Sequence, residues 1–167
     1  MSDVTGTYYA GGAFVGYGTE LRIGQGDGPP ETFVAVPDIM SITPGDMSTG
    51  IVDVTHLRST DRHREKKGTI RDSGPFTISG NYRPGHGGHT VAGGDGFNAT
   101  HNLPALWRDV TEANFEIELP LDATGVSPAE VLSFRGVVTR YQIGNITIDQ
   151  KVEFTAEITP LGAYTLP

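Results

Sequence analysis

Two segments near the C-terminal end alternate apolar and polar residues, and this period of two constrains the fold more than any other feature. In ANFEIELPL the apolar residues from Phe115 to Leu119 alternate with two glutamates, and in ITIDQKVEFTAEIT the same period runs from Ile146 to Ile158. Only Gln150 breaks the apolar series. Successive side chains of a strand point to opposite faces of a sheet, so both segments are predicted to be strands with one buried and one solvated face.

The rest of the chain adds strands and turns to this pattern. SFRGVVTRYQI precedes a Gly144-Asn145 turn, which predicts a hairpin of two long strands, each roughly 30 to 40 Å at about 3.3 Å per residue. Shorter strands are predicted in TELRIG, in FVAVPDIMSI with an interruption at Pro37, in IVDVTHL and in GPFTISGNY. With 23 glycines and 11 prolines in 167 residues, turns should be many and long helices few. The prediction is a mainly β, β-sandwich or barrel-like single domain over residues 1–167.

Three other segments complete the predicted organisation. Residues 1–18 are rich in glycine and tyrosine and are expected to form a flexible N-terminal segment. Residues 83–102 form a Gly/His-rich loop. Residues 103–111, LPALWRDVT, predict the one short helix, because Pro104 suits a first helical turn. The apolar residues that share one face of this helix are Leu103, Leu106, Trp107 and Val110.

Residues 56–72 form a long polar arm between two predicted strands. The stretch HLRSTDRHREKKG within it holds five of the chain's 12 lysines and arginines, although the formal charge of the protein is −8. From Arg58 to Lys67 the net charge is +3, which leaves about −11 in the remainder. Loops of this length are usually functional or disordered until bound, so the segment is predicted to be an arm or long hairpin rather than a simple turn. A second copy of the chain is an acidic partner for such an arm, and charge complementarity would favour head-to-tail contacts. The basic residues are Arg58, Arg62, Arg64, Lys66 and Lys67.

The sequence lacks the motifs of most enzyme and metal-binding classes. His86-Gly-Gly-His89 lies in a glycine-rich loop with no third ligand at a diagnostic offset, so no metal site is predicted. The carboxylates on the predicted strands could form a pair for glycoside cleavage, but alternation alone places polar residues there. No phosphate-binding loop, nucleophile elbow or cysteine occurs. The protein is not expected to be an enzyme or to need a cofactor.

Composition also bounds where the protein acts. No segment approaches the length of about 18 apolar residues that crosses a bilayer, and no leader sequence is recognised, so we expect folding in a cytoplasm and no membrane partner. A pI near 4.9 argues against tight binding of nucleic acid, which needs basic groups at phosphates. An acidic surface is nevertheless compatible with a passage that DNA crosses without sticking.

The order of these features resembles the tail tube (major tail) proteins of long-tailed, siphophage-type bacteriophages. The segments that carry the resemblance extend from about Gly18 to Gly162. They are GTELRIG, FVAVPDIMSITPGDMSTGIVDVTHLRST, EKKGTIRDSGPFTISGNYRP, LPALWRDV, FEIELP and FRGVVTRYQIGNITIDQKVEFTAEITPLG. Each piece alone is weak, and the specificity lies in their combination and order.

The resemblance implies a structural virion protein without catalytic residues. Such proteins form hexameric rings that stack into a tube, and strands of six subunits make a continuous β-barrel around a lumen that conducts the genome. The long arm contacts the adjoining ring, which assigns that role to residues 56–72. The implied partners are further copies of the chain, the tail tip or initiator, tape-measure and tail terminator proteins, and DNA that passes without specific binding. The implied location is the phage tail, assembled in the host cytoplasm.

Two questions stay open at this level. Acidic residues on either solvated strand face could line the lumen, and Lys151 interrupts one of these faces. The candidates are Glu116, Glu118, Asp149, Glu153 and Glu157. The alternative function is a monomeric carbohydrate-binding or adhesive decoration module that stacks sugars on Tyr8, Tyr9, Tyr17 and Trp107. A tube of a related injection device would share the same fold.

Overall fold

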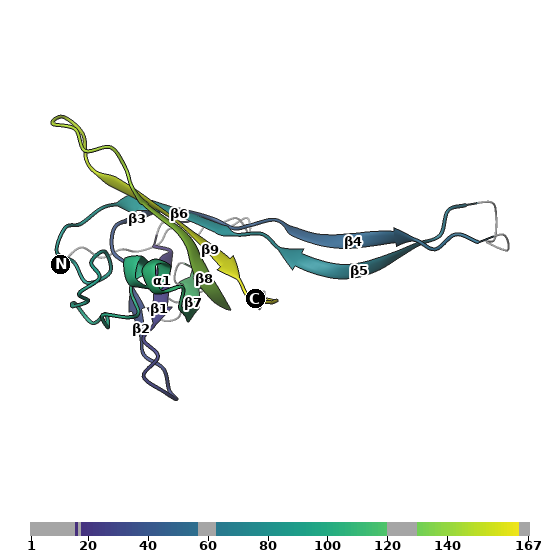
Figure 1. Ribbon diagram of the computed structural model, residues 1–167, viewed down its shortest axis with the longest axis horizontal. Coiled ribbons are helices and arrows are strands. Elements are labelled where there is room, and N and C mark those ends of the chain that lie inside the picture. The colour runs from purple at the N-terminus through teal and green to yellow at the C-terminus, as the bar shows by residue number, and fades with distance from the viewer. Residues whose placement is uncertain (1–15, 17, 57–62, 120–129, 164–167) are drawn as a thin grey trace, which may run out of the picture.

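The computed structural model describes residues 16, 18–56, 63–119 and 130–163. Within them the chain forms one domain with a curved sheet, a short helix and a projecting two-stranded hairpin (Figure 1). The strands are β1 (Glu20–Gly24), β2 (Phe33–Ala35), β3 (Ile39–Thr43), β4 (Met47–Asp53), β5 (Lys66–Ser73), β6 (Phe76–Asn81), β7 (Glu112–Glu118), β8 (Val131–Ile143) and β9 (Glu153–Pro160), and the helix is α1 (Leu103–Asp109). The predicted mainly β, single-domain fold with one short helix is confirmed.

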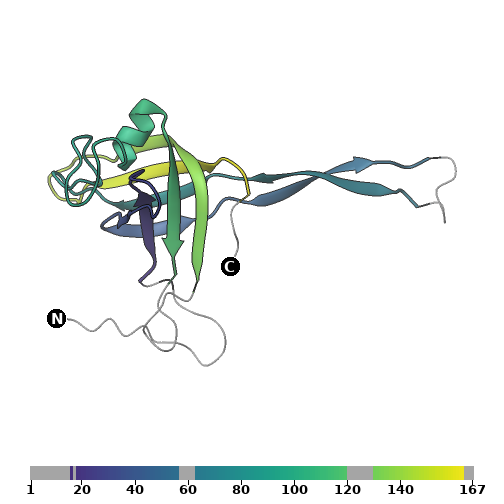
Figure 2. The same ribbon diagram turned by 90° about the horizontal axis from the view of Figure 1, so that it is seen from below.

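The main sheet has the antiparallel order β2-β1-β7-β8-β9-β6-β3, so β8 is its central strand. With 13 residues β8 is about 43 Å long, and a β-bulge between Val138 and Arg140 interrupts its register with β9. A bulge bends a strand and increases its twist. Figure 2 shows that β7 and the first part of β8 run across the direction of β9 and β6. The sheet therefore folds over itself as two halves whose strands run in crossing directions.

The core lies between the two halves of the sheet. Phe134 of β8 stacks on Phe76 of β6 with ring centroids 4.5 Å apart and on Phe115 of β7 at 5.5 Å. Each of these strands alternates buried and solvated residues, as the sequence predicts for β6, β7 and β9. Gly80 is required at its position because a Cβ there would lie 2.8 Å from the Phe154 ring and 2.6 Å from the Asp38 carbonyl oxygen. Close aromatic packing between strands distant in sequence thus joins the two halves.

The helix α1 covers the core with its first turn. Leu103 and Leu106 are fully buried, and Asn102 caps the helix by accepting a hydrogen bond from the Ala105 N–H at 3.0 Å. The prediction that Trp107 and Val110 share this buried face is wrong, since they are 48% and 71% exposed. The helix ends at Asp109. Val110 then takes a left-handed conformation and the chain turns toward β7, so Trp107 and Val110 lie outside the buried first turn of the helix.

The expected strand from Ile146 onward is also wrong in its first half. β9 begins only at Glu153, and residues 144–152 form a loop closed by a 2.7 Å hydrogen bond from the Gly144 N–H to the Glu153 carbonyl. Ile146 and Ile148 are 79% and 99% exposed at the tip of this loop, whereas the end of the loop contacts the body, since Val152 accepts a hydrogen bond from the Tyr82 N–H at 2.8 Å. The hairpin between the last two strands is confirmed, but β9 is about 26 Å long rather than 30 to 40 Å.

Candidate self-assembly surfaces

The predicted polar arm is the outer part of a longer hairpin formed by β4 and β5. The strands pair from Met47 opposite Ser73 to Asp53 opposite Lys66, with an irregularity between Thr49 and Ile51. The two strands form a sheet of their own that projects away from the body (Figures 1 and 2). β5 occupies the second part of the segment that the sequence predicts to be an arm or long hairpin. Its sequence, KKGTIRDS, shows no apolar alternation because neither of its faces is buried.

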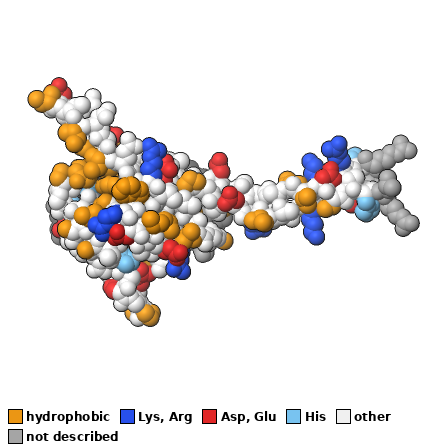
Figure 3. All heavy atoms as spheres, viewed as in Figure 1, with side chains coloured by type: hydrophobic (Ala, Val, Ile, Leu, Met, Phe, Trp, Pro, Cys, Tyr) orange, Lys and Arg blue, Asp and Glu red, His pale blue; other side chains and the backbone are white. Residues whose placement is uncertain are grey.

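Apolar side chains are exposed along this hairpin (Figure 3). Ile70 is 84% exposed and Ile51 is 67% exposed, and Met47, Val52 and Val54 add to the apolar surface. An isolated two-stranded hairpin is at best marginally stable in water, and exposed apolar patches usually mark contact sites. The hairpin therefore has the properties of a segment that another surface covers.

The basic residues follow the same hairpin. Lys66 and Lys67 begin β5 and Arg71 lies further along it, and none of these three forms an ion pair with the described residues. Arg64 lies just before β5 and is likewise without an ion pair there, whereas Arg58 and Arg62 fall outside the described residues. Figure 3 shows the Lys and Arg side chains projecting from the outer part of the hairpin. Both the charge and the apolar surface of this segment are thus available to a partner.

Four of the five acidic candidates lie on the solvated face of the main sheet. Glu116 and Glu118 belong to the half formed by β2, β1, β7 and the first part of β8, whereas Glu153 and Glu157 belong to β9 in the other half. The placement of Asp149 on a strand is wrong, since it lies in the 144–152 loop. The two pairs of glutamates share one continuous face, but the fold of the sheet turns them in different directions.

Ion pairs differ between the two halves of this face. On β7, Glu118 lies 2.6 Å from Arg22, while Glu116 forms no ion pair with the described residues. Partial burial and the neighbouring charge of Glu118 raise the pKa of Glu116. On β9, Glu157 lies 3.1 Å from Arg140 and Glu153 lies 3.3 Å from Lys151. The carboxylates of β9 thus neutralise the cations beside them.

Small hydroxyl residues occupy several positions on the solvated face of the second half. The strand register places Thr77 and Ser79 of β6 beside Glu157 and Thr155 of β9. Thr139 of β8 lies 3.4 Å from Thr159 of β9, measured between hydroxyl oxygens. These positions present hydroxyl groups and paired charges, while Met40 of β3 in the same half is 53% exposed and lies 3.1 Å from the Lys151 ammonium.

The Gly/His-rich loop 83–102 covers one end of the core. His86 lies 3.8 Å from Asp95, and the His89 ring is 97% buried against the ring of Phe154 at 4.5 Å. Burial lowers the pKa of His89, so the neutral ring is favoured. No group of three or more His, Cys, Asp or Glu side chains in the described part of the chain could hold a metal ion. The loop is thus a structural cover in which His89 acts as a buried aromatic residue.

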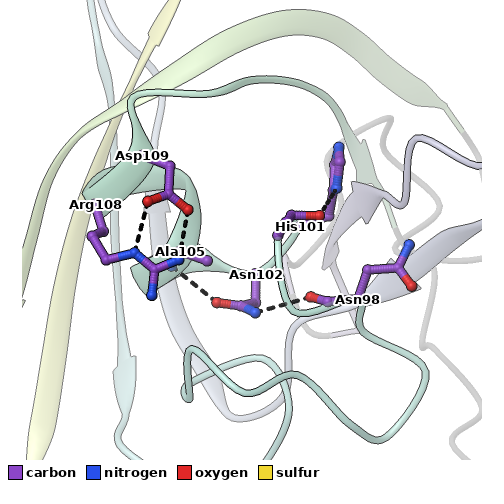
Figure 4. A network of polar contacts seen from close by, with 7 residues as sticks. Asn98, His101, Asn102, Ala105, Arg108 and Asp109 are labelled. Atoms are coloured by element: carbon purple, nitrogen blue, oxygen red, sulfur yellow. Dashed lines mark hydrogen bonds and ion pairs between the residues drawn. The ribbon is translucent and has the colours of Figure 1, made fainter.

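The end of this loop is held by the cap of α1 (Figure 4). Asn102 is fully buried, and its amide donates to the Asn98 carbonyl at 3.0 Å while its oxygen caps the helix. Gln25, after β1, accepts from the Asn98 N–H at 2.7 Å. At the far end of the helix, Arg108 pairs with Asp109 at 2.6 Å in solvent. The loop and helix are therefore anchored on β1 by buried amides.

Only one of the four residues of the carbohydrate-binding alternative lies in the described structure. Tyr8, Tyr9 and Tyr17 lie outside the described residues, and Trp107 is half-exposed on α1. None of the helices within the described ranges is both long and apolar enough to cross a membrane.

Comparison with solved structures identifies the fold. The tail of an empty gene transfer agent (GTA) particle with C6 symmetry matches with a TM-score of 0.62 at 14% identity, over 93% of this chain and 99% of that chain. A sheath/tube terminator of an extracellular contractile injection system matches with a TM-score of 0.63 at 11% identity, over 92% and 95%. The SPP1 tail tube matches with a TM-score of 0.58 at 8% identity, over 86% and 73%. Neither the family models nor the curated protein sequences give a match. The chain has the fold of tail tube proteins, and this fold is not restricted to siphophages.

Proposed function

We propose that this protein is the building block of a phage-type tail tube, in which hexameric rings stack around a lumen that conducts the genome. The proposal is carried chiefly by the β4–β5 hairpin, whose exposed apolar and basic side chains have no partner within the described chain. The tail tube fold supports it, since that fold occurs in a GTA tail of C6 symmetry and in the SPP1 tail tube. The protein is then a structural component of the virion tail rather than an enzyme.

The hairpin supplies the contact between rings in this proposal. A basic arm on a chain that is acidic elsewhere is attracted to another copy of the same chain. Because the arm of one copy and the surface that receives it are different parts of the molecule, the contact is heterologous and can continue without limit. From here on, the arm means the whole β4–β5 hairpin. It carries the basic residues Arg58, Arg62, Arg64, Lys66 and Lys67 and the exposed apolar residues of β4 and β5.

The direction of the arm indicates which half of the sheet lines the lumen. β4 follows β3, and β5 leads into β6, so the arm continues the half formed by β3, β6, β9 and the last part of β8 (Figure 2). If the arm reaches the next ring, these strands run along the tube. A barrel closed by six subunits needs strands that follow its axis with a tilt of about 35–45°, and strands that cross the axis cannot close it.

The lumen wall is therefore assigned to the half that carries Glu153 and Glu157. These glutamates neutralise Lys151 and Arg140 within the same subunit, so the face offers DNA phosphates no unpaired cation from those two residues. The hydroxyl residues beside them add no charge. Glu116 and Glu118 then lie away from the lumen, on the half whose strands run around the tube.

The partners follow from the same assembly. Neighbouring copies complete the ring and the stack, and the ends of the tube require proteins of the tail tip and a tail terminator. Solved structures with this fold include an injection-system baseplate and a tube-terminating cap. A tape-measure protein and the passing DNA would occupy the lumen.

Electron microscopy tests the proposed function. The purified protein, concentrated or supplied with tail-tip initiators, should form rings or tubes. Reversing the charge at Arg62, Arg64, Lys66 and Lys67 should block tube growth while leaving the circular dichroism spectrum unchanged. Arg83→Glu, in the loop that covers the core, is the control and should not affect growth. Monomers under all conditions would contradict the tube, and normal tubes from the reversed variant would contradict the role of the arm.

Thiol labelling tests which half lines the lumen. The sequence has no cysteine, so Glu153→Cys and Glu112→Cys each introduce one thiol at side chains of similar exposure, 51% and 47%. A polymer-linked maleimide too large to enter the tube should label both variants as monomers. In tubes it should label only the Glu112→Cys variant. Equal labelling of both variants in tubes would contradict the assignment.

A further inference from the structure

The loop of residues 144–152 is a second exposed apolar surface, separate from the arm. Ile148 is 99% exposed and Ile146 is 79% exposed at the end of the β8–β9 hairpin. Asp149 lies next to them and forms no ion pair or hydrogen bond with the described residues. Figure 3 shows hydrophobic side chains at this tip, which projects at the opposite end of the molecule from the arm. Two adjacent exposed isoleucines on a projecting loop favour a contact with another surface.

A groove at the root of the arm has the complementary chemistry. It has a volume of about 280 Å³ and lies between the first residues of β4, the last residues of β5 and the segment that follows β9. Met47 and Pro160 supply apolar walls, and Arg71 supplies a cation. Arg71 has no ion pair within the described residues, so its charge is free to meet a carboxylate. The rest of the lining is mainly polar and includes Ser48, Thr49 and Asp72, so the groove offers a small apolar site beside the charge of Arg71.

The side chains of the loop are complementary to residues that line the groove. An isoleucine side chain suits the apolar walls, and Asp149 suits Arg71 as a charge-assisted pair. Asp72 also lines the groove, and the loop carries amide donors for it in Asn145 and Gln150. The loop and the groove lie on opposite sides of the body, so they do not meet within one subunit (Figure 1).

We propose that the 144–152 loop of one subunit binds in the groove at the root of the arm of a subunit in the adjoining ring. This inference rests on the proposed function, because it assumes head-to-tail stacking of copies. An arm that lies along the next copy brings the opposite end of that copy to the root of the arm, which is where the groove is. Each axial contact then has two parts, the arm on one side and the loop on the other.

Cross-linking within assembled tubes tests the contact. A double variant with Met47→Cys and Ile148→Cys, treated with a short bismaleimide, should give a ladder of covalent multimers beyond the dimer on denaturing gels. The matched control carries Val91→Cys and Ile148→Cys and should give no ladder. Val91 is an exposed residue in the loop that covers the core. Each single variant should stop at the monomer or dimer.

The outcomes separate this inference from the proposed function. Tubes in the micrograph with no ladder from the double variant would overturn the loop contact and leave the tube intact. Absence of rings and tubes from the unmodified protein would overturn the proposed function itself.

A charge exchange provides a second test with an independent readout. Asp149→Arg should raise the protein concentration needed for tube growth by about fivefold, which corresponds to a weak ion pair. Adding Arg71→Asp to the same chain should lower that concentration again, since the pair is restored with reversed sign. If the second substitution brings no recovery, the pairing of Asp149 with Arg71 is wrong.

Discussion

The sheet body and the β4–β5 hairpin are built from similar residues but are stabilised in different ways. In the body, Ile78 of β6 is fully buried between the halves of the sheet, whereas Ile70 of β5 is 84% exposed on the hairpin. The body therefore holds its own hydrophobic core, while the hairpin exposes the side chains that would stabilise it. In the proposed tube, the body would thus fold in the single chain and the hairpin would gain its stability from another copy.

The largest expected effect comes from breaking the core. Phe134→Ala removes the ring that lies between Phe76 and Phe115, and should lower the free energy of unfolding by about 3–5 kcal/mol. Urea unfolding at a concentration where the protein is monomeric measures this loss. A change below 1 kcal/mol, roughly what a partly exposed residue would give, would contradict the placement of the core.

A smaller effect is expected at the helix cap. Asn102→Ala removes the acceptor for the Ala105 N–H and the donor to Asn98, and should cost about 1–2 kcal/mol. Asn102→Ser is the matched control, because a hydroxyl can still cap the helix, and should recover part of the loss. Equal losses from both substitutions would show that the cap contributes nothing measurable.

The body should also lose stability as the pH falls. Burial lowers the pKa of His89 in the folded protein, so the unfolded state binds the proton more readily. The stability is then present above the ordinary histidine pKa of about 6.5 and decreases below it. Urea unfolding at pH about 7.5 and about 5.5 should show a smaller loss for His89→Gln than for the unmodified protein. Identical losses would exclude His89 as a contributor.

The smallest effect on the single chain is expected in the hairpin. Ile70→Ala should change the free energy of unfolding by less than about 0.5 kcal/mol, while Ile78→Ala, the same substitution in the core, should cost about 2–5 kcal/mol. Tube growth should be weaker in the Ile70→Ala variant, although the free energy of unfolding of its monomer is nearly unchanged. A loss at Ile70 as large as at Ile78 would remove the distinction between the two regions.

Burial explains why some strands can be predicted from the sequence and others cannot. β6, β7 and β9 have one buried face, and alternation marks each of them in the sequence. β5 has no buried face, so its strand carries no periodic signal. The reverse error occurs around Ile146 and Ile148, where the alternation continues into a loop that leaves both isoleucines exposed.

Other features have no signature in the local sequence. The bulge beside Val138 sets the crossing of the two halves, yet the residues around it continue an ordinary strand pattern. Trp107 has the spacing of a core residue, but the chain leaves the helix after Asp109 and the ring stays half-exposed. The basic arm is evident from charge alone, whereas the groove at its root joins residues from three separate parts of the chain and needs the fold to be seen.

Hydrogen exchange on monomers and tubes tests the contrast between body and hairpin most directly. In the monomer, the paired amides of β6, β7 and β9 should exchange slowly, and those of β4 and β5 should exchange quickly, because an exposed two-stranded hairpin opens often. In tubes, β4 and β5 should become as protected as the body. Slow exchange in the hairpin of the free monomer, or fast exchange in assembled tubes, would contradict the account.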